Sequence, residues 1–497
     1  MEKKKINKKK VALIIWLIFV YFLMLLTKWV KNNFAEYNFE AILFQIKYPM
    51  VENVSNKIIL SFVKEVILTE ILVVAIIVVI SLIIKRKNID LSKYKKILFY
   101  LIIYFSISGL AYFIVNLRID SYIVKKLEVS TFIENNYVDP KEVKVTFPEK
   151  KRNLIFIYLE SIESAYAGIE DNGIMNNSLI PEIVALEKSN INFSNTDTLG
   201  GMNSTVGSGF TVGSIVAQTS GLPLLTAMNG NLYGNFEYFM PNAYTLGEIL
   251  EKEGYHQVFI MGSNKEYGGR GKYLSQHGNY EIIDYKYAKE SGLYTGPREF
   301  WGFLDYALYD LAKDELTELS SEDRPFNLSL LTIDTHNPDG IACKYCDTNE
   351  NLPKDERYKR IISCASKQLA SFISWVKTQD FYDNTTIIFV GDHPTMSTTI
   401  TDEYPDGYEK TSVCCIINPP EELKTSNFKE KYREYTSFDM YPTTLAAIGA
   451  KIEGDRLGLG TNLFSSKSTL AEDFGMDYIN NELMKSSRFY ENKILKK

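Results

Sequence analysis

Three long apolar runs near the N-terminus constrain this chain more than any other feature. They cover Val11–Thr27, Val66–Ile84 and Ile97–Val115, and only Glu70 interrupts them, near an end. Each run is close to the roughly 20 residues that span a bilayer core as a helix. The first run alone would also fit a cleaved signal peptide, but it lacks a small-residue cleavage site. We therefore predict an integral membrane anchor, residues 1–117, with three uncleaved spans at about 11–27, 66–84 and 97–115.

The lysines predict how this anchor is oriented, because cytoplasmic loops carry the positive excess. Met1–Lys10 holds six lysines against one Glu, and Lys85–Lys96 holds six basic residues against one Asp. The segment Lys28–Glu65 between the first two spans is nearly balanced. We therefore expect a multi-pass protein with the N-terminus inside, and everything after about Arg118 on the external face of the membrane.

The overall charge argues against a nucleic-acid partner. The formal net charge is −6 and the isoelectric point is 5.6, whereas nucleic-acid binders usually carry a dense basic patch. After the anchor we expect a juxtamembrane connector at 118–151, which mixes charges with apolar residues, as an amphipathic helix on the lipid surface would. One large domain at 152–480 follows, and then a basic C-terminal tail at 481–497.

Five cysteines are an odd number for an oxidising exterior. Cys343 and Cys346 have the spacing of a metal knuckle, but no second Cys pair or His pair completes a zinc site. We expect instead a disulfide from one of these two to Cys364. Cys414 and Cys415 lie in an apolar stretch and are predicted to be core residues.

Short apolar runs in the large domain predict strands of an α/β fold. Asn153–Leu159, Asn327–Ile333 and Thr386–Val390 are rich in Ile, Leu and Phe. Strands that are apolar on both faces are typical of parallel sheets covered by helices. Helix-spaced apolar residues lie between them, at Ile180–Ser189, Tyr244–Glu253 and Ala365–Lys377. The domain is therefore predicted to be an α/β sandwich.

Ionisable residues follow each of these strands directly. Glu160 follows the first, Asp334-Thr-His336 the second and Asp392-His393 the third. In open α/β sheets ligands bind outside the carboxyl ends of the strands, so one pocket is expected to collect these side chains. Adjacent Asp and His commonly supply oxygen and nitrogen ligands to a divalent metal, and Glu160 would add a third ligand. The alternative is an Asp that starts a turn beside a surface His, and Glu163 is expected to be an exposed acid at a helix start.

The segment 200–218 is a glycine-rich loop that runs into an apolar helix beginning near Thr211. Backbone N–H groups of such a loop can approach a phosphate. A metal held by Glu160, Asp392 and His393 would activate the Thr211 hydroxyl as a nucleophile. Thr211 would serve equally well as a helix N-cap, and Ser204, Thr205 and Ser208 are rival nucleophiles. A second glycine-rich patch at 268–277 offers Arg270 as a cation for a phosphate.

Taken in order, these motifs resemble the membrane-anchored phosphoglycerol transferases of the alkaline phosphatase/sulfatase superfamily. This group includes lipoteichoic acid synthases and the enzymes that modify osmoregulated periplasmic glucans. The resemblance covers about residues 153–462 and rests on Leu159-Glu-Ser161, Gly207-Ser-Gly-Phe-Thr-Val-Gly-Ser214, Gly221-Leu-Pro-Leu224, Gly269-Arg-Gly-Lys272, Thr335-His-Asn-Pro-Asp-Gly340 and Gly391-Asp-His393. It implies an alkaline phosphatase/sulfatase-like sandwich and a bacterial-type cell membrane, with the catalytic domain extracellular or periplasmic.

The resemblance also implies roles for particular residues. Thr211 would be the nucleophile, and Glu160, Asp392 and His393 would join it as ligands of one Mn²⁺ or Mg²⁺ ion. Arg270 and His336 would bind the phosphoglycerol head group. The implied reaction moves a glycerophosphoryl group from phosphatidylglycerol, through an ester on the threonine, to a glycan or glycolipid acceptor, and releases diacylglycerol.

Some residues depart from that pattern and leave rival functions open. Lipoteichoic acid synthases have a His where this chain has Met261, and they have five spans rather than three. Phosphoethanolamine transferases of the same superfamily also use a membrane anchor and a metal-bound threonine. A catalytically inactive binding homologue is the non-enzymatic alternative, although it would have no chemical reason to retain the complete set of Glu160, Thr211, Asp392 and His393.

Overall fold

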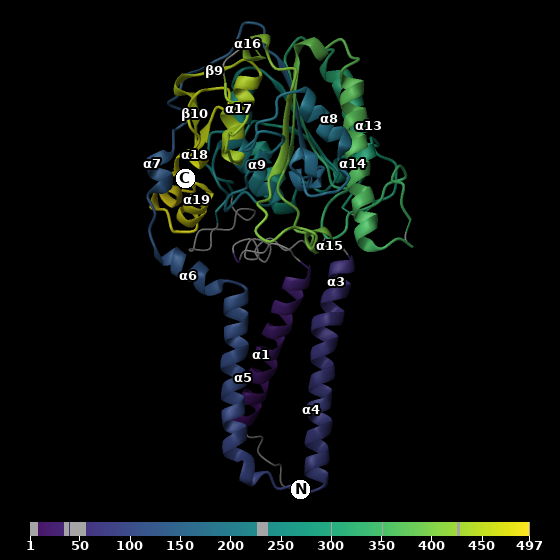
Figure 1. Cartoon of the computed structure of the whole chain (residues 1–497), viewed down its shortest axis with the longest axis vertical. Coiled ribbons are helices and arrows are strands. Elements are labelled where there is room, and N and C mark those ends of the chain that lie inside the picture. The colour runs from purple at the N-terminus through teal and green to yellow at the C-terminus, as the bar shows by residue number, and fades with distance from the viewer. Residues whose placement is uncertain are drawn as a thin grey trace. The chain divides into compact units, whose positions relative to one another are not determined.

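The computed structural model describes residues 8–33, 39, 56–225, 237–299, 301–349, 351–424 and 428–496. It divides into two units, which are drawn together in Figure 1 and described separately here. The smaller unit comprises Met1–Ile42 and Val51–Val124, and the larger comprises Leu43–Met50 and Lys125–Lys497.

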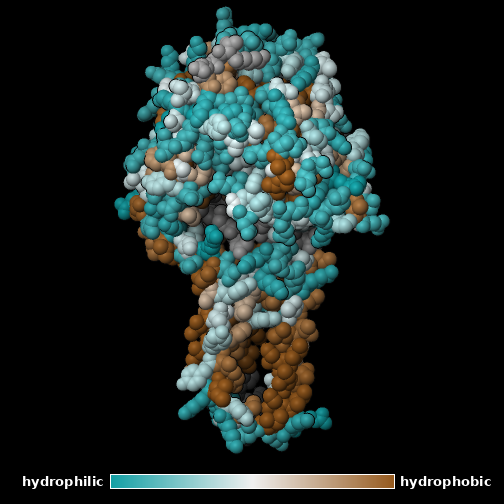
Figure 2. Space-filling model, in the orientation of Figure 1, coloured by the Kyte–Doolittle hydropathy of each residue, from teal (hydrophilic) through white to brown (hydrophobic). Residues whose placement is uncertain are grey.

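The smaller unit is built from long apolar helices. Helix α1 is Lys8–Asn33 and α5 is Lys95–Asn116. Between them lie α3 (Asn56–Phe62) and α4 (Thr69–Arg86), and the apolar helical segment Ile59–Arg86 includes the end of α3 and all of α4. Within the part of the chain that the structure describes, three helices are long and apolar enough to cross a membrane, and they contain the three predicted spans. Figure 2 shows the apolar side chains gathered on these helices, which can therefore anchor the chain in a lipid phase. The predicted orientation depends partly on residues 1–7 and on the segment between the first two spans. Residues 1–7 and most of that segment lie outside the described residues.

A seven-stranded sheet forms the centre of the larger unit, in the order β3-β8-β7-β2-β6-β4-β5. The predicted strands are present and pair in parallel, with β2 between β6 and β7. The sheet as a whole is mixed, because β8 runs antiparallel to β7 and β3 antiparallel to β8. The strands are β2 Asn153–Leu159, β3 Gly201–Met202, β4 His256–Met261, β5 Glu281–Ile283, β6 Phe326–Leu331, β7 Thr385–Gly391 and β8 Ser412–Ile417.

Both faces of this sheet are covered by helices, as the apolar strands predict. Along β2, Phe156 and Tyr158 join one core cluster while Ile155 and Ile157 join the other. This alternation is the two-residue period of a strand buried on both sides. The first cluster takes residues from α9 (Thr211–Ser220), α10 (Leu246–Lys252), α11 (Arg270–Gln276) and α17 (Met440–Ala447), and the second from α8 (Pro181–Ser189), α12 (Tyr285–Glu290), α13 (Asp305–Leu319) and α14 (Lys354–Val376). Figure 1 shows α8, α13 and α14 on one side of the sheet and α9 and α17 on the other.

The segments on either side of the predicted large domain also belong to its fold. Within the expected connector, α6 (Ile119–Leu127) is helical, Phe132 and Ile133 of α7 (Phe132–Asn136) are buried, and β1 (Val145–Thr146) pairs with β9 (Lys451–Ile452). At the other end, α18 (Leu470–Phe474) and α19 (Met476–Leu483) precede a π-helical turn, Tyr490–Ile494.

The expected C-terminal tail is packed rather than free. Tyr490 and Ile494 are buried in the first core cluster. The Tyr490 hydroxyl donates to the backbone oxygen of Pro223 (2.5 Å) and accepts from the backbone N–H of Leu225 (3.3 Å). The segment is basic, but its apolar residues pack it against the core of the larger unit.

The expected disulfide is not formed among the described residues, where all five cysteines are free thiols. The thiols of Cys343, Cys346 and Cys364 nevertheless gather at one place, between the loop after β6 and helix α14. Cys414 and Cys415 are fully buried in β8, as predicted.

Candidate active site

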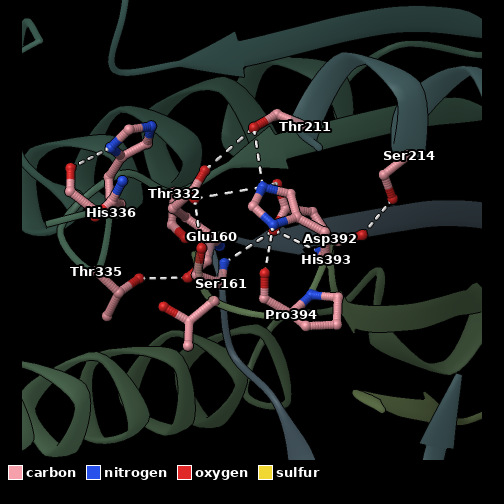
Figure 3. Close-up of polar contacts among 12 residues, drawn as sticks. Glu160, Ser161, Thr211, Ser214, Thr332, Thr335, His336, Asp392, His393 and Pro394 are labelled. Carbon is pink, nitrogen blue, oxygen red and sulfur yellow. Dashed lines mark hydrogen bonds and ion pairs between the residues drawn. The ribbon is translucent and has the colours of Figure 1, made fainter. Parts of the chain in front are cut away.

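Two neighbouring strands bring Glu160 and Asp392 together. Strand β2 ends at Leu159 and β7 at Gly391, and these two residues face each other in the parallel register. The residues that follow therefore leave the sheet side by side, and the backbone N–H of Asp392 donates to the backbone oxygen of Leu159 (3.0 Å). The parallel pairing of β2 and β7 thus places Glu160 and Asp392, which are far apart in the sequence, in one cluster, shown in Figure 3.

Glu160, Asp392 and His393 form a compact set of oxygen and nitrogen donors. Nε2 of His393 lies 3.6 Å from Oε1 of Glu160 and 3.5 Å from Oδ2 of Asp392. The candidate ligand atoms all lie within 4.8 Å of one another, and all three side chains are buried. Oδ2 of Asp392 accepts no hydrogen bond from any described residue. A buried carboxylate oxygen without a donor is costly, so the set fits a divalent cation between its members.

Surrounding hydrogen bonds fix the direction of these donors. Oδ1 of Asp392 accepts from the backbone N–H groups of Ser161 (2.9 Å) and His393 (2.8 Å), which leaves Oδ2 directed at the cluster. Nδ1 of His393 lies 2.8 Å from the backbone oxygen of Pro394. Because a carbonyl oxygen only accepts, Nδ1 carries the proton and Nε2 presents its lone pair. The Ser161 hydroxyl donates to Oε1 of Glu160 (2.7 Å), so Ser161 supports two members of the set.

The pKa values at this cluster reflect mutual repulsion of buried negative charge. Burial, and then the charge of Glu160, raise the pKa of Asp392 to about 7. Burial acts to lower the pKa of His393, but the charges of Asp392 and Glu160 outweigh it and the net shift is upward. Without a cation the cluster therefore retains protons that a cation would displace.

Thr211 presents its hydroxyl to the same cluster from the start of α9, a helix on one face of the sheet. Its Oγ1 lies 3.4 Å from Oε2 of Glu160 and 3.4 Å from Nε2 of His393. Thr211 is the first residue of α9, whose N-cap is Phe210, and no side-chain cap is present among the described residues. The hydroxyl is thus not used for capping. Helix α9 is held in place because the Ser214 hydroxyl donates to the backbone oxygen of Asp392.

Two of the three rival hydroxyls of the glycine-rich loop are engaged elsewhere, whereas Oγ of Ser204 is buried without a hydrogen-bond partner among the described residues. Those of Thr205 and Ser208 lie 3.1 Å apart, and Ser208 also accepts from the backbone N–H of Thr205 (2.8 Å). Both side chains are buried. The structure therefore brings together Glu160, Asp392, His393 and Thr211 from the predicted set, and favours Thr211 among the candidate hydroxyls.

Arg270 is buried and held by several acceptors. Its guanidinium donates from Nη2 to Ser263 Oγ (2.8 Å) and to the backbone oxygen of Asn264 (3.1 Å), and from Nε to the backbone oxygen of Tyr267 (3.1 Å). Gly268 (φ 63°) and Gly269 (φ 76°) adopt the left-handed conformation that this sharp entry into α11 requires. Burial lowers the Arg270 pKa, and nearby Tyr267, Glu160 and Asp392 oppose that shift. A fixed cation thus acts electrostatically on the carboxylates of the cluster.

Aromatic rings connect Arg270 to His336. The guanidinium lies 4.9 Å from the Tyr267 ring centre, Tyr267 meets Trp301 edge to face at 5.0 Å, and the Trp301 and His336 rings are 4.4 Å apart. We name Arg270, Tyr267, Trp301 and His336 the aromatic row. His336 takes no part in the contacts that link Glu160 to His393 in Figure 3. No spacing in the sequence connects Trp301 with His336, so Trp301 could not be identified from the sequence.

A family comparison agrees with this arrangement. The model of the sulfatase family matches residues 152–450, which contain every residue of the cluster. The chain belongs to the sulfatase family. The sulfatase domain accordingly has an alkaline phosphatase-like fold, with a mixed central sheet between two layers of helices.

Individual relatives add detail to the family assignment. Phosphoglycerol transferase I of Escherichia coli O127:H6 is 30% identical over 335 residues, and that of Shigella flexneri is 31% identical over 336 residues. Each alignment covers 66% of this chain but only 41% of the relative. The crystal structure of the lipoteichoic acid synthase LtaP from Listeria monocytogenes shares the fold at a TM-score of 0.50 and 19% identity, covering 68% of this chain and 82% of that one.

Glu163 in the sulfatase domain corrects an expectation. It lies at a helix start, as the N-cap of the short 3-10 helix Ser164–Tyr166, but it is completely buried rather than exposed. Its Oε2 accepts from the backbone N–H of Thr395 (3.2 Å), and its Oε1 accepts from the hydroxyl of Tyr404. The chain turns inward after β2, so Glu163 ties this turn to the segment that follows His393.

A second buried carboxylate pair, Asp305 and Asp334, shapes the turn that carries His336. Oδ1 of Asp334 accepts from the backbone N–H of Asp305 (3.0 Å), and Oδ1 of Asp305 accepts from the backbone N–H of Ile333 (2.7 Å). Burial raises the pKa of both side chains, and their proximity adds to the shift of Asp334. Asp305 begins α13, where the sequence gives no sign of a partner 29 residues away.

Proposed function

We propose that this chain is a metal-dependent phosphoglycerol transferase of a bacterial-type cell membrane. It would transfer a glycerophosphoryl group from phosphatidylglycerol to a cell-surface glycan or glycolipid and release diacylglycerol. The observation that carries the proposal is the position of Oγ1 of Thr211, 3.4 Å from ligand atoms of both Glu160 and His393. The chain spans less than half the length of the curated phosphoglycerol transferases it matches, so their name supports this activity without establishing it.

Glu160, Asp392, His393 and Thr211 would together hold one cation. Carboxylate and hydroxyl oxygens with a single imidazole suit Mn²⁺ or Mg²⁺. When bound, such an ion supplies a Lewis acid that lowers the pKa of the threonine hydroxyl and withdraws charge from the phosphoryl oxygens. The buried Asp392 oxygen that lacks a hydrogen-bond donor supports this ligand set.

The reaction would proceed in two displacements at phosphorus. The Thr211 hydroxyl gives up its proton as Oγ1 attacks the phosphodiester, the bond from phosphorus to the diacylglycerol oxygen breaks, and that oxygen takes up a proton and leaves as diacylglycerol. The glycerophosphoryl group is then an ester of Thr211. An acceptor hydroxyl attacks the same phosphorus, loses its proton, and the Thr211 oxygen departs. The position of Thr211 at the start of α9 also places the helix N-terminus near the anionic group.

The aromatic row would bind the head group that is transferred. Arg270 is a permanently charged donor suited to phosphate oxygens, and its existing hydrogen bonds hold it ready. His336 is half-buried against Trp301 and can contact the glycerol hydroxyls. With these roles, Arg270 and His336 would make the site selective for the phosphoglycerol head group among phosphodiesters.

A lipid donor agrees with the apolar helices of the smaller unit. An anchored enzyme meets its substrate at the membrane surface, where lipid head groups are concentrated. The lysine-rich segments favour three spans with the sulfatase domain on the extracellular or periplasmic side, where surface glycans and glycolipids are found.

The decisive experiment offers labelled phosphatidylglycerol or phosphatidylethanolamine to the full-length protein in detergent with Mn²⁺ and measures diacylglycerol release. Release from phosphatidylglycerol alone, lost in Thr211→Ala, is the expected result. Release from phosphatidylethanolamine alone would transfer the chain to the phosphoethanolamine transferases. Silence with both lipids, persisting across an acceptor screen, would support an inactive binding homologue.

A further inference from the structure

Three thiols lie close together and have no part in the proposed reaction. Sγ of Cys343 is 3.6 Å from Sγ of Cys346 and 3.7 Å from Sγ of Cys364. The three sulfur atoms all lie within 4.8 Å of one another. Cys343 and Cys364 are buried, and Cys346 is half-buried. Two of these residues come from the loop after β6 and the third from α14, so the fold itself brings them together.

The spacing of the sulfur atoms matches a tetrahedral metal site. A Zn–S bond of about 2.3 Å gives a distance of about 3.8 Å between two sulfur ligands of a tetrahedron. The observed separations of 3.6 and 3.7 Å are close to that edge. Both are far longer than the roughly 2.05 Å of a disulfide bond.

Backbone N–H groups point at these sulfur atoms. The N–H of Tyr345 donates to Sγ of Cys343 (3.4 Å), and the N–H of Cys343 donates to Sγ of Cys346 (3.3 Å). Donors directed at sulfur stabilise thiolate charge and orient the ligands of a metal site. A pair of neutral thiols would gain little from them.

The amide of Gln368 lies beside two of the three sulfur atoms. Its Nε2 is 3.5 Å from Sγ of Cys364 and 3.7 Å from Sγ of Cys343. An oxygen or nitrogen ligand bound at about 2.1 Å would lie about 3.6 Å from each sulfur ligand. Oε1 of Gln368 is buried and accepts no hydrogen bond from the described residues. Because the two amide atoms are exchangeable in position, turning the amide over would present this oxygen to the cation and satisfy it.

We propose that Cys343, Cys346 and Cys364 bind a structural zinc ion, with the Gln368 amide at the fourth corner. Three thiols lose their protons on binding, and soft thiolate ligands select zinc over the Mn²⁺ or Mg²⁺ proposed for Glu160, Asp392 and His393. The zinc site ties the loop that carries His336 to helix α14. An ion pair between Asp339 and Arg357 (2.9 Å) joins the same two segments. This proposal stands independently of the reaction that the enzyme catalyses.

The test uses full-length protein in detergent, purified without oxygen, chelators or metal-affinity resin, and analysed for metals. In a His393→Ala background the catalytic cation is removed, so any zinc that remains belongs to the second site. We expect about one zinc per chain there, bound through sulfur at about 2.3 Å by X-ray absorption. Replacement by Co²⁺ should give the intense near-ultraviolet absorption of sulfur ligation.

Variants distinguish the ligands from other cysteines. Cys346→Ser should reduce zinc content at least about tenfold at limiting metal, and its half-buried position makes a folded variant attainable. Gln368→Ala should weaken zinc binding while retaining sulfur ligation. Cys414→Ala is the matched control, because Cys414 is buried in β8 outside the cluster, and its zinc content should be unchanged.

Two results would overturn the zinc site. One is a disulfide between Cys364 and Cys343 or Cys346, found by mass spectrometry of unreduced peptides from the protein purified without oxygen. The other is three titratable thiols that bind neither Zn²⁺ nor Co²⁺. Either result would leave the Thr211 assay unaffected, so failure of this proposal is separable from failure of the proposed activity.

Discussion

Nε2 of His393 lies 3.4 Å from Oγ1 of Thr211, although 182 positions separate the two residues in the chain. His393 follows β7 in the sheet, whereas Thr211 begins a helix on one face of it. The lone pair of His393 Nε2 therefore lies beside the Thr211 hydroxyl, which does not cap α9.

Removing the Thr211 hydroxyl should abolish turnover without unfolding the protein. We expect Thr211→Ala to lower kcat at least about a thousandfold, because loss of a nucleophile leaves only the residual effect of binding and electrostatics. Stability should change by less than about 0.5 kcal/mol, since Thr211 does not cap α9. Diacylglycerol release and thermal unfolding measure the two effects. Thr205→Ala should remain active, and full activity of Thr211→Ala would exclude it as nucleophile.

His393→Ala should lose both metal and activity. The substitution removes the imidazole ligand and leaves the carboxylates of Glu160 and Asp392 facing each other. We expect manganese retained after gel filtration to fall about tenfold or more. The matched control is His256→Ala, because His256 pairs with Glu281 (2.9 Å) and Glu322 (2.9 Å) outside the cluster. Unchanged manganese in His393→Ala would contradict the ligand set.

The stabilisation conferred by the metal should increase with pH. In the metal-free fold the pKa of Asp392 is raised to about 7 from an ordinary value of 3.8, and that of His393 is raised as well. Raised values mean that the folded state holds extra protons, so metal-free stability falls as pH rises from about 4 through 7. A cation requires deprotonated ligands, so its affinity rises over the same range.

The difference in Tm with Mn²⁺ and with a chelator should therefore widen from about pH 5 to about pH 8. Other buried acids contribute equally to both samples and cancel in the difference. In Asp392→Asn the difference should be small at every pH. A difference that widens toward acid pH in the unsubstituted protein would refute this assignment.

Arg270→Lys should impair use of the lipid more than binding of the metal. Lysine cannot reproduce the fork of donors that now reaches Ser263 and the backbone of Asn264 and Tyr267. We expect KM for phosphatidylglycerol to rise about tenfold, with manganese content unchanged. Arg324→Lys, whose partner is the part-exposed Glu322, is the control. Equal loss of metal in Arg270→Lys would assign Arg270 to the metal cluster instead of the head group.

Protease added to intact cells should cleave the sulfatase domain. The lysine-rich segments predict that this domain lies outside the membrane, and the face of the domain shown in Figure 2 is largely polar. Immunoblotting of the domain before and after treatment gives the result, with detergent-opened cells as the reference. Complete protection in intact cells with cleavage after opening would reverse the orientation.

Local patterns determined much of the fold and of the candidate site. Continuous apolar runs are sufficient to indicate strands buried on both faces, as β2 and β7 confirm. Ionisable residues at the ends of those strands then pointed to Glu160, Asp392 and His393, because parallel strands end at one edge of a sheet. The three long apolar helices could also be predicted from the sequence, since the length of an apolar run is a local property.

Only the tertiary structure decided which distant residues meet. Glu163 was expected at the surface but is buried against Thr395 and Tyr404, and the C-terminal segment is packed through Tyr490. The contacts of Trp301 with His336 and of Cys343 with Cys364 depend on how loops cross the helices of the sandwich. Local sequence fixes the conformation and polarity of a segment, but its partners are chosen by long-range packing and the burial it permits.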